Sequence, residues 1–255
     1  MPATGLLGLP DTARACLFDL DGVLTRTATV HMAAWKRTFD GFLRDRDPGE
    51  AEFTQLDYNR YVDGKPRADG VRDFLTSRGI GLPEGSPGDL PDAATVNGLA
   101  SRKNELVLRE LEEHGVEVYP GSIAYLRAVK AAGLATAVVT ASANGEQVIA
   151  AAGFADLIDV RIDGVVAARE GLRGKPHPDT FLAAAGALQV EPPAAAVFED
   201  ALSGVAAGRA GGFGYVVGVD RVGHAAELAA QGADVVVQDL VELLGKNTDA
   251  GEEGQ

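Results

Sequence analysis

The chain contains 255 residues, of which 46% are hydrophobic and 24% are charged, a normal balance for a globular protein. Its 37 acidic and 23 basic residues give a formal net charge of −14, which argues against nucleic acid and acidic membrane surfaces as partners. Cys16 is the only cysteine and no stretch of about 18 residues is apolar, so we expect a cytoplasmic protein with no internal disulfide and no membrane-spanning helix.

The first predicted element is a buried strand over residues 15–18, within the stretch CLFDLDGVLT. Asp19 and Asp21 follow it directly, and Gly22 suits the tight turn that comes next. Residues two apart on a strand point to the same side, and open α/β sheets bind their ligands at the carboxyl ends of strands. The two carboxylates therefore indicate a site at the end of this strand.

The next segment, residues 27–115, has a different character. Its stretches VHMAAWKRTFDGFLRD, VRDFL and ASRKNELVLRELEEHG place apolar residues at helical spacing and carry few strand signals. Residues 81–92 are rich in glycine and proline and predict a loop. We expect a helical insertion here, with the sheet resuming after residues 118–121.

From residue 134 onward, strand and helix patterns alternate, as in a parallel sheet with helices on both faces. Strands are predicted over 134–140, 159–164, 194–200, 213–220 and 233–240. Helices are predicted over 145–154, 178–189 and 201–211, the first of them stopped by Gly153. The predicted fold class is α/β, with a doubly wound, Rossmann-like parallel-sheet core (1–26 and 116–245), an inserted helical domain (27–115) and a flexible tail (246–255).

Four groups of polar residues follow strands or lie in loops at the expected carboxyl edge of this sheet: Asp19 with Asp21, Thr140 with Ser142, Lys175 in GKPHPD, and Glu199 with Asp200. Four carboxylates that converge repel one another, and a divalent cation resolves that conflict. Oxygen ligands together with a phosphate suit Mg²⁺. An aspartate beside a metal and a lysine can attack phosphorus, and a second aspartate can move the proton at the bridging oxygen.

The motifs FDLDGVLT, the strand-terminal Thr140, GKP and FEDALSG occur in this order over residues 15–245. Together they resemble the haloacid dehalogenase-like phosphotransferase superfamily. The resemblance implies that Asp19 is the nucleophile, that Asp21 is the general acid/base, and that Thr140 and Lys175 bind the transferring phosphoryl group. It also implies that residues 27–115 form a mobile helical cap over the core.

The same resemblance implies how Mg²⁺ is held. Asp19 and Asp200 would provide carboxylate ligands, and Asp21 would provide its backbone carbonyl. Glu199 would lie close to the metal shell.

Within the superfamily, HMAAWK, DGKPRADG, SRKNE, VYPG and TASANG resemble the β-phosphoglucomutase group. This resemblance implies that Arg67 grips the phosphate that is not being transferred, helped by Ser142 and Asn144. It also places His31 on the cap helix next to the hinge, with a structural role or a hinge or substrate role both open.

Three positions depart from the pattern of that group, which has two lysines and an acidic residue where this chain has Ala143, Ser101 and Arg26. Arg26 and Lys65 are the candidates to replace the lost positive charge. The departures bear on the second phosphate site and therefore on mutase activity.

The leading hypothesis is a Mg²⁺-dependent enzyme that converts β-glucose 1-phosphate into glucose 6-phosphate through an aspartyl-phosphate and a bisphosphate. A sugar-phosphate phosphatase on the same scaffold and a non-catalytic phosphosugar-binding protein are the alternatives. The expected partner is a small sugar phosphate, and the expected assembly is a monomer or a weak oligomer.

Overall fold

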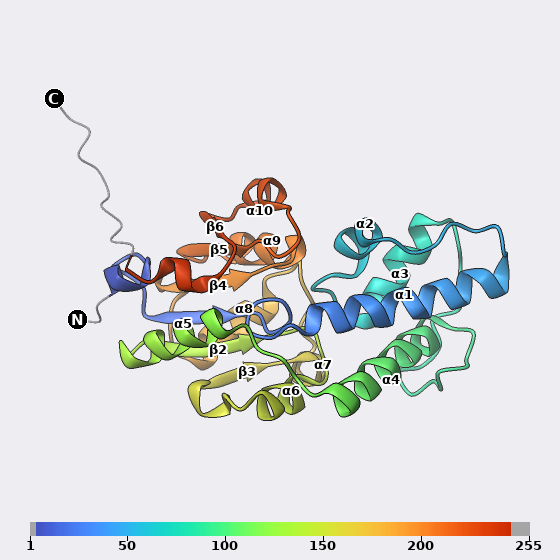
Figure 1. Ribbon diagram of the computed structural model, residues 1–255, viewed down its shortest axis with the longest axis horizontal. Helices are drawn as coiled ribbons and strands as arrows, with labels where there is room; N and C mark the ends of the chain where they lie inside the picture. Colours follow the sequence, from blue (N-terminus) through green and yellow to red (C-terminus); the bar gives the residue numbers. More distant parts are fainter. Residues whose placement is uncertain (1–3, 246–255) are drawn as a thin grey trace.

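The computed structural model describes residues 4–245 and is built on a six-stranded parallel sheet (Figure 1). The strands are β1 (Ala15–Phe18), β2 (Ala135–Val139), β3 (Val160–Ile162), β4 (Ala195–Glu199), β5 (Tyr215–Val219) and β6 (Val235–Val237). Their order across the sheet is β3-β2-β1-β4-β5-β6, and every neighbouring pair is parallel. This order confirms the predicted doubly wound, Rossmann-like α/β fold.

Helices cover both faces of the sheet, because successive strand residues point to opposite sides. Cys16 and Phe18 pack under one set of helices, whereas Ala15 and Leu17 pack under the other. The first face is covered by α5 (Pro120–Ala131) and α6 (Gly145–Ala152), with the short 3-10 helices η1 (Thr4–Leu7) and η5 (Leu240–Leu243). The second face is covered by α7 (Gly164–Glu170), α8 (Asp179–Ala187), α9 (Leu202–Ala210) and α10 (Ala225–Gln231).

The cap segment lies beyond one end of the sheet and has a hydrophobic core of its own (Figure 1). It contains α1 (Thr27–Arg46), α2 (Gln55–Asp57), the π-helical turn η2 (Tyr58–Val62), α3 (Arg67–Ser77) and α4 (Val96–His114). Trp35 and Phe39 of α1 stack on each other, and Phe39 also packs against Phe53 and Phe74. The predicted loop at 81–92 is free of helix and strand.

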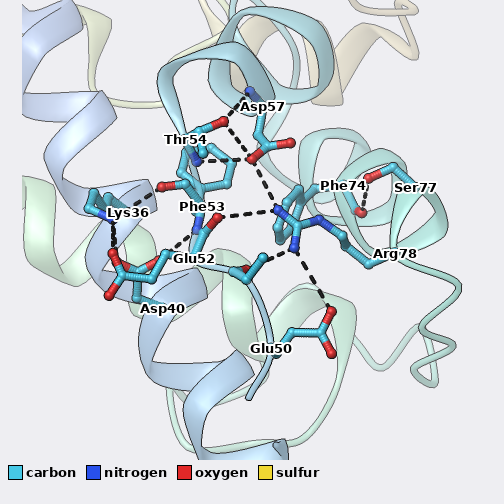
Figure 2. A network of polar contacts seen from close by, with 11 residues as sticks. Lys36, Asp40, Glu50, Glu52, Phe53, Thr54, Asp57, Phe74, Ser77 and Arg78 are labelled. Atoms are coloured by element: carbon cyan, nitrogen blue, oxygen red, sulfur yellow. Dashed lines mark hydrogen bonds and ion pairs between the residues drawn. The ribbon is translucent and has the colours of Figure 1, made fainter. Parts of the chain in front are cut away.

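A polar network fixes the loop that joins α1 to α2 (Figure 2). Lys36 donates hydrogen bonds to Asp40, Glu52 and the carbonyl of Phe53 at 2.7, 2.9 and 3.1 Å. The guanidinium of Arg78 bonds to the carbonyl of Ala51 and pairs with Asp57 at 3.1 Å. These contacts hold the chain that leads into η2, where the cap approaches the core.

Several elements were not predicted. Helices α5, α7 and α10 have no counterpart in the sequence interpretation, and β6 is shorter than the predicted strand at 233–240. Gly153 does end α6, in a left-handed conformation with φ of 72°. The tail predicted at 246–255 lies outside the described residues. Within residues 4–245, no helix is both long enough and apolar enough to cross a membrane.

The position of the candidate site follows from the strand order. The order of the strands reverses direction between β1 and β4. Doubly wound sheets bind ligands in the crevice at such a switch point. The hydrogen bond from the amide of Asp19 to the carbonyl of Phe198 (2.9 Å) holds the two strand ends together. The residues that follow β1, β2 and β4 therefore meet at one place, beneath the cap.

Candidate active site

A cavity of about 40 Å³ lies between the carboxyl edge of the sheet and the cap. From the core it is lined by Asp19, Asp21, Thr140, Ser142 and Asp200. From the cap it is lined by His31, Trp35, Tyr58, Asp63, Lys65, Arg67 and Lys103. The structure thus gathers most of the residues singled out in the sequence around one small cavity.

Lys175 binds two buried carboxylates, one of which, Asp19, lines this cavity. Its ammonium lies 2.5 Å from Asp19 Oδ1, forms an ion pair with Glu199, and donates to the carbonyl of Val139 at 3.1 Å. All three charged side chains are almost completely buried, with 2%, 7% and 0% exposure for Lys175, Asp19 and Glu199. A buried lysine between two carboxylates keeps both of them partnered in a region that water does not reach.

The donor set at the same place fits a divalent cation. Oxygen atoms of Asp19, Glu199 and Asp200 lie within 4.8 Å of one another. Three carboxylates and one lysine leave two negative charges, the charge that a dication such as Mg²⁺ neutralises. Asp200 is buried, and among the described residues it has no hydrogen-bond or ion-pair partner. Such an orphaned carboxylate is costly unless a cation binds it.

Two glycines keep this cluster compact. A Cβ atom on Gly22 would lie 1.7 Å from Asp200 Oδ2, and one on Gly204 would lie 1.9 Å from the carboxyl carbon of Glu199. Gly22 also has a φ of 95°, which side-chain-bearing residues rarely adopt. The turn after β1 and the start of α9 can therefore approach the carboxylates only because these positions lack side chains.

The carboxylate of Asp21 sits on the cap side of the cavity. It accepts hydrogen bonds from the hydroxyls of Thr27 and Thr140, the latter at 3.0 Å, and His31 Nε2 lies 3.5 Å away. Asp19 and Asp21 thus line one cavity, as the two-residue spacing predicted, but they have different partners. Asp19 is held by a core lysine, whereas Asp21 is held by two threonine hydroxyls, with a cap histidine nearby.

These environments shift the two carboxyls in opposite directions. Burial raises the pKa of Asp19 well above its ordinary value, although the Lys175 charge opposes the rise. Burial also raises the pKa of Asp21, but the nearby His31 and the two threonine hydroxyls outweigh it and leave that pKa below the ordinary value. Asp21 is therefore ionised at neutral pH and able to take a proton.

The residues expected to bind a second phosphate are only partly gathered. Arg67 and Ser142 line the cavity, and the guanidinium of Arg67 has no hydrogen-bond or ion-pair partner among the described residues. Asn144 is not in the cavity wall and donates to Asn104 of the cap at 3.0 Å. Lys65 lines the cavity, but its ammonium pairs with Asp73 at 2.7 Å.

Arg26, the other candidate to replace a lost lysine, lies outside the cavity wall. It packs on the ring of Tyr119 and approaches Glu117 at 3.9 Å. Its side chain is half exposed, so it does not supply a cation to the cavity.

The geometry can be compared with known proteins. A family model described as haloacid dehalogenase-like hydrolase matches residues 13–212. The chain belongs to this family. It is 55% identical over 247 residues to proteins named β-phosphoglucomutase from Mycobacterium bovis and Mycobacterium tuberculosis, and the match covers 94% of each chain.

Solved structures of similar fold include a β-phosphoglucomutase and the protein CbbY. A β-phosphoglucomutase from Clostridium difficile superposes with a TM-score of 0.71 at 24% identity, covering 91% of this chain and 93% of the other. The protein CbbY from Rhodobacter sphaeroides, solved in complex with phosphate, has a TM-score of 0.68 at 25% identity, covering 91% and 96%. The first of these shows the likeness of the fold alone.

The sequence interpretation missed Lys103, which lines the cavity from the cap. Its ammonium lies 2.8 Å from His31 Nδ1 and 5.1 Å from the centre of the Trp35 ring, and burial lowers its pKa to about 7. A signal was present, since Leu99, Lys103 and Val107 fall on one buried stripe of α4. A lysine where the helical period calls for an apolar residue indicates a specific partner.

Asp63 and Tyr58 were also missed, and for them no pattern in the sequence could have helped. Both belong to the π-helical turn η2 and its end, a region without clear periodicity. They reach the cavity only because η2 folds back against the core.

Proposed function

We propose that this chain interconverts β-glucose 1-phosphate and glucose 6-phosphate by phosphoryl transfer through Asp19. The observation that carries the proposal is the pairing of Lys175 with Asp19 at the floor of a cavity shared by core and cap. The relatives that are 55% identical over almost the whole chain bear the name of this activity.

In the proposed mechanism, Asp19 is the nucleophile. Lys175 holds Oδ1 at 2.5 Å, so the second carboxylate oxygen is available to attack phosphorus. The new bond joins that oxygen to phosphorus, and the bond from phosphorus to the sugar oxygen breaks. The product of this half-reaction is an aspartyl-phosphate, which a sugar hydroxyl attacks in the reverse sense in the second half.

Asp21 moves the proton in both halves. As a carboxylate it takes the proton of the sugar hydroxyl that attacks the aspartyl-phosphate. The carboxylic acid so formed gives the same proton to the sugar oxygen that leaves phosphorus in the other half-reaction, which restores the carboxylate. Its position between Thr27, Thr140 and His31 fixes the carboxylate on the cap side of Asp19. The hydrogen bond from Lys103 to His31 Nδ1 leaves the Nε2 proton of a neutral imidazole facing Asp21.

Mg²⁺ fits the oxygen donors of Asp19, Glu199 and Asp200, and when bound it would neutralise charge on the transferring phosphoryl group. Thr140 and Lys175 are proposed to hold the oxygens of the same group. Arg67 and Ser142 are proposed to hold the phosphate at the other end of the sugar, because the Arg67 guanidinium is otherwise without an anionic partner. The cap must open to admit the sugar, and we propose residues 27–115 as the moving unit.

Hydrolysis of a sugar phosphate is the alternative that the site also supports. The two reactions differ in whether water or a sugar hydroxyl attacks the aspartyl-phosphate, which closure of the cap decides. Ala143 stands where the β-phosphoglucomutase pattern has a lysine, so the distal phosphate has fewer cations around it. This difference favours hydrolysis.

One assay separates the two reactions. The protein is incubated with β-glucose 1-phosphate, Mg²⁺ and a trace of the 1,6-bisphosphate, and both glucose 6-phosphate and free phosphate are measured. Glucose 6-phosphate formed in excess of free phosphate supports the mutase, and free phosphate alone supports the phosphatase. Asp19→Asn is the control, and it should lower either activity by at least ~10³-fold because the nucleophile is lost. Turnover of Asp19→Asn within tenfold of the wild type would contradict both mechanisms.

A further inference from the structure

Asp63 brings a fifth carboxylate to the candidate site, and it is the only one of the five that comes from the cap. Its backbone carbonyl accepts a hydrogen bond from Ser203 Oγ at 2.8 Å, near the start of α9. The next residue, Gly64, has a φ of 70°, and a Cβ atom there would lie 2.5 Å from the same hydroxyl. This close approach of cap backbone to core fixes where the Asp63 side chain begins.

The Asp63 carboxyl lines the active-site cavity together with Asp19 and Asp200. Burial raises the pKa of Asp63 to about 7, although a hydrogen bond with Tyr58 opposes the rise. Burial, followed by the charge of Asp63, also raises the pKa of Asp200. Both residues line the same cavity of about 40 Å³, which places the two carboxyls near each other.

No cation in the described chain forms an ion pair with either carboxyl, although the charge of Lys175 favours the ionised form of both and Lys103 also interacts with Asp63. Lys175 is already shared between Asp19 and Glu199. Among residues 4–245, neither Asp63 nor Asp200 forms an ion pair within 4.0 Å. With the cap on the core, the ionised forms of Asp63 and Asp200 repel each other without a paired cation, which disfavours closure until positive charge is added.

We propose that Asp63 couples closure of the cap to occupation of the metal site, by repelling the empty carboxylate cluster and by stabilising a bound divalent cation from its outer shell. The proposal rests on the metal site of the proposed function. Coupling of this kind is reciprocal, so if the cation favours the closed cap, closure raises the affinity for the cation by the same factor. Outer-shell carboxylates typically change metal affinity by about 10- to 100-fold.

The test compares Asp63→Asn with Asp63→Glu, which keeps the charge, and with Asp92→Asn, which makes the same chemical change at an exposed position of the cap. The affinity for Mg²⁺ alone is measured by titration calorimetry, without any sugar. Closure is followed through the fluorescence of Trp35, the only tryptophan of the chain, which lines the cavity from the cap. Neither readout requires turnover, so the result is independent of whether the proposed reaction is correct.

Asp63→Asn should weaken Mg²⁺ binding by about 10-fold and should reduce the change of Trp35 emission on adding Mg²⁺. Asp63→Glu should stay within about threefold of the wild type, and Asp92→Asn should match it. Equal Mg²⁺ affinities of Asp63→Asn and the wild type would overturn the proposal. If the variant in that case raised KM for a sugar phosphate, Asp63 would be a sugar contact and not part of the metal site. If Asp63→Asn does not fold, the wild type decides, since unchanged Trp35 emission and radius of gyration on adding Mg²⁺ would refute the coupling.

Discussion

Replacing Lys175 by methionine tests whether its ammonium group keeps the buried carboxylates of Asp19 and Glu199 stable in the folded protein. Methionine keeps much of the length and apolar stem of lysine but removes the charge that pairs with Asp19 and Glu199. The two carboxylates would then be buried, close to each other and without a cation. The variant should lose activity and should also be markedly less stable at neutral pH.

The size of the loss can be bounded from the structure. Removing one partner of a buried ion pair typically costs about 3–5 kcal/mol. A stranded carboxyl can escape by taking up a proton, and for an ordinary pKa near 4 this costs about 4 kcal/mol at pH 7. With Asp19 and Glu199 at 7% and 0% exposure, water cannot relieve either charge. We therefore expect Lys175→Met to lower the free energy of unfolding by about 3–5 kcal/mol at pH 7.

The dependence on pH gives the sharper check. A carboxyl whose pKa is higher in the folded than in the unfolded state favours folding at low pH, and this contribution is lost as the pH rises through the folded value. Burial already raises the pKa of Asp19, and without the Lys175 charge it rises further. The deficit of the variant should therefore shrink when the pH falls from about 8 to about 5.

Urea unfolding of both proteins in a chelating buffer measures this deficit at each pH. Lys130→Met is the matched control, because Lys130 pairs with Asp159 at the surface, with side chains 31% and 42% exposed, and should cost less than about 1 kcal/mol. A deficit for Lys175→Met no larger than that of the control, or one that does not change with pH, would refute the reasoning.

Three further predictions concern the two sides of the cavity. Arg67→Ala should lower kcat/KM for a bisphosphorylated sugar by ~10- to 200-fold, with little change for a small aryl phosphate, and parallel losses on both substrates would exclude a distal-phosphate role. Gly22→Ala should displace the carboxylate of Asp200, because the new Cβ would lie 1.7 Å from it. The Mg²⁺ concentration needed for half-maximal activity should then rise, and an unchanged concentration would speak against Asp200 as a Mg²⁺ ligand. Burial lowers the pKa of Lys103 to about 7, so KM for a sugar phosphate should rise as the pH rises through that value. In Lys103→Arg, KM should not change over this pH range, and an equal rise of KM in both proteins would show that another group titrates.

The core of the fold could be predicted because its strands are short apolar runs with chemistry at their ends. The runs before Asp19, Thr140 and Glu199 end close to the residues expected, and helices cover both faces of the sheet. In a parallel sheet the carboxyl ends of neighbouring strands meet by geometry, so order along the chain was enough to bring these groups together.

The cap contribution could not be predicted in the same way. Arg67, Lys103 and Asp63 come from α3, α4 and the end of η2, and their meeting depends on how these elements pack over the core. Sequence spacing fixes neighbours within one helix but not the crossing of separate helices. Arg26 illustrates the limit, because it follows closely on the turn after β1 in sequence and yet packs on Tyr119 outside the cavity.

Charge balance explains why the site is divided between core and cap. On the core side, Lys175 compensates one of the three carboxylates of Asp19, Glu199 and Asp200, and the two remaining negative charges suit a dication. On the cap side, Lys103 and Arg67 bring positive charge that no described anion fully matches, which suits the phosphate groups of a substrate. A cap that closes without a cation and a phosphate would bury the excess negative charge of the core and the excess positive charge of the cap. Closure over both ligands neutralises each excess. The same electrostatics that assemble the site would therefore make closure depend on its being fully occupied.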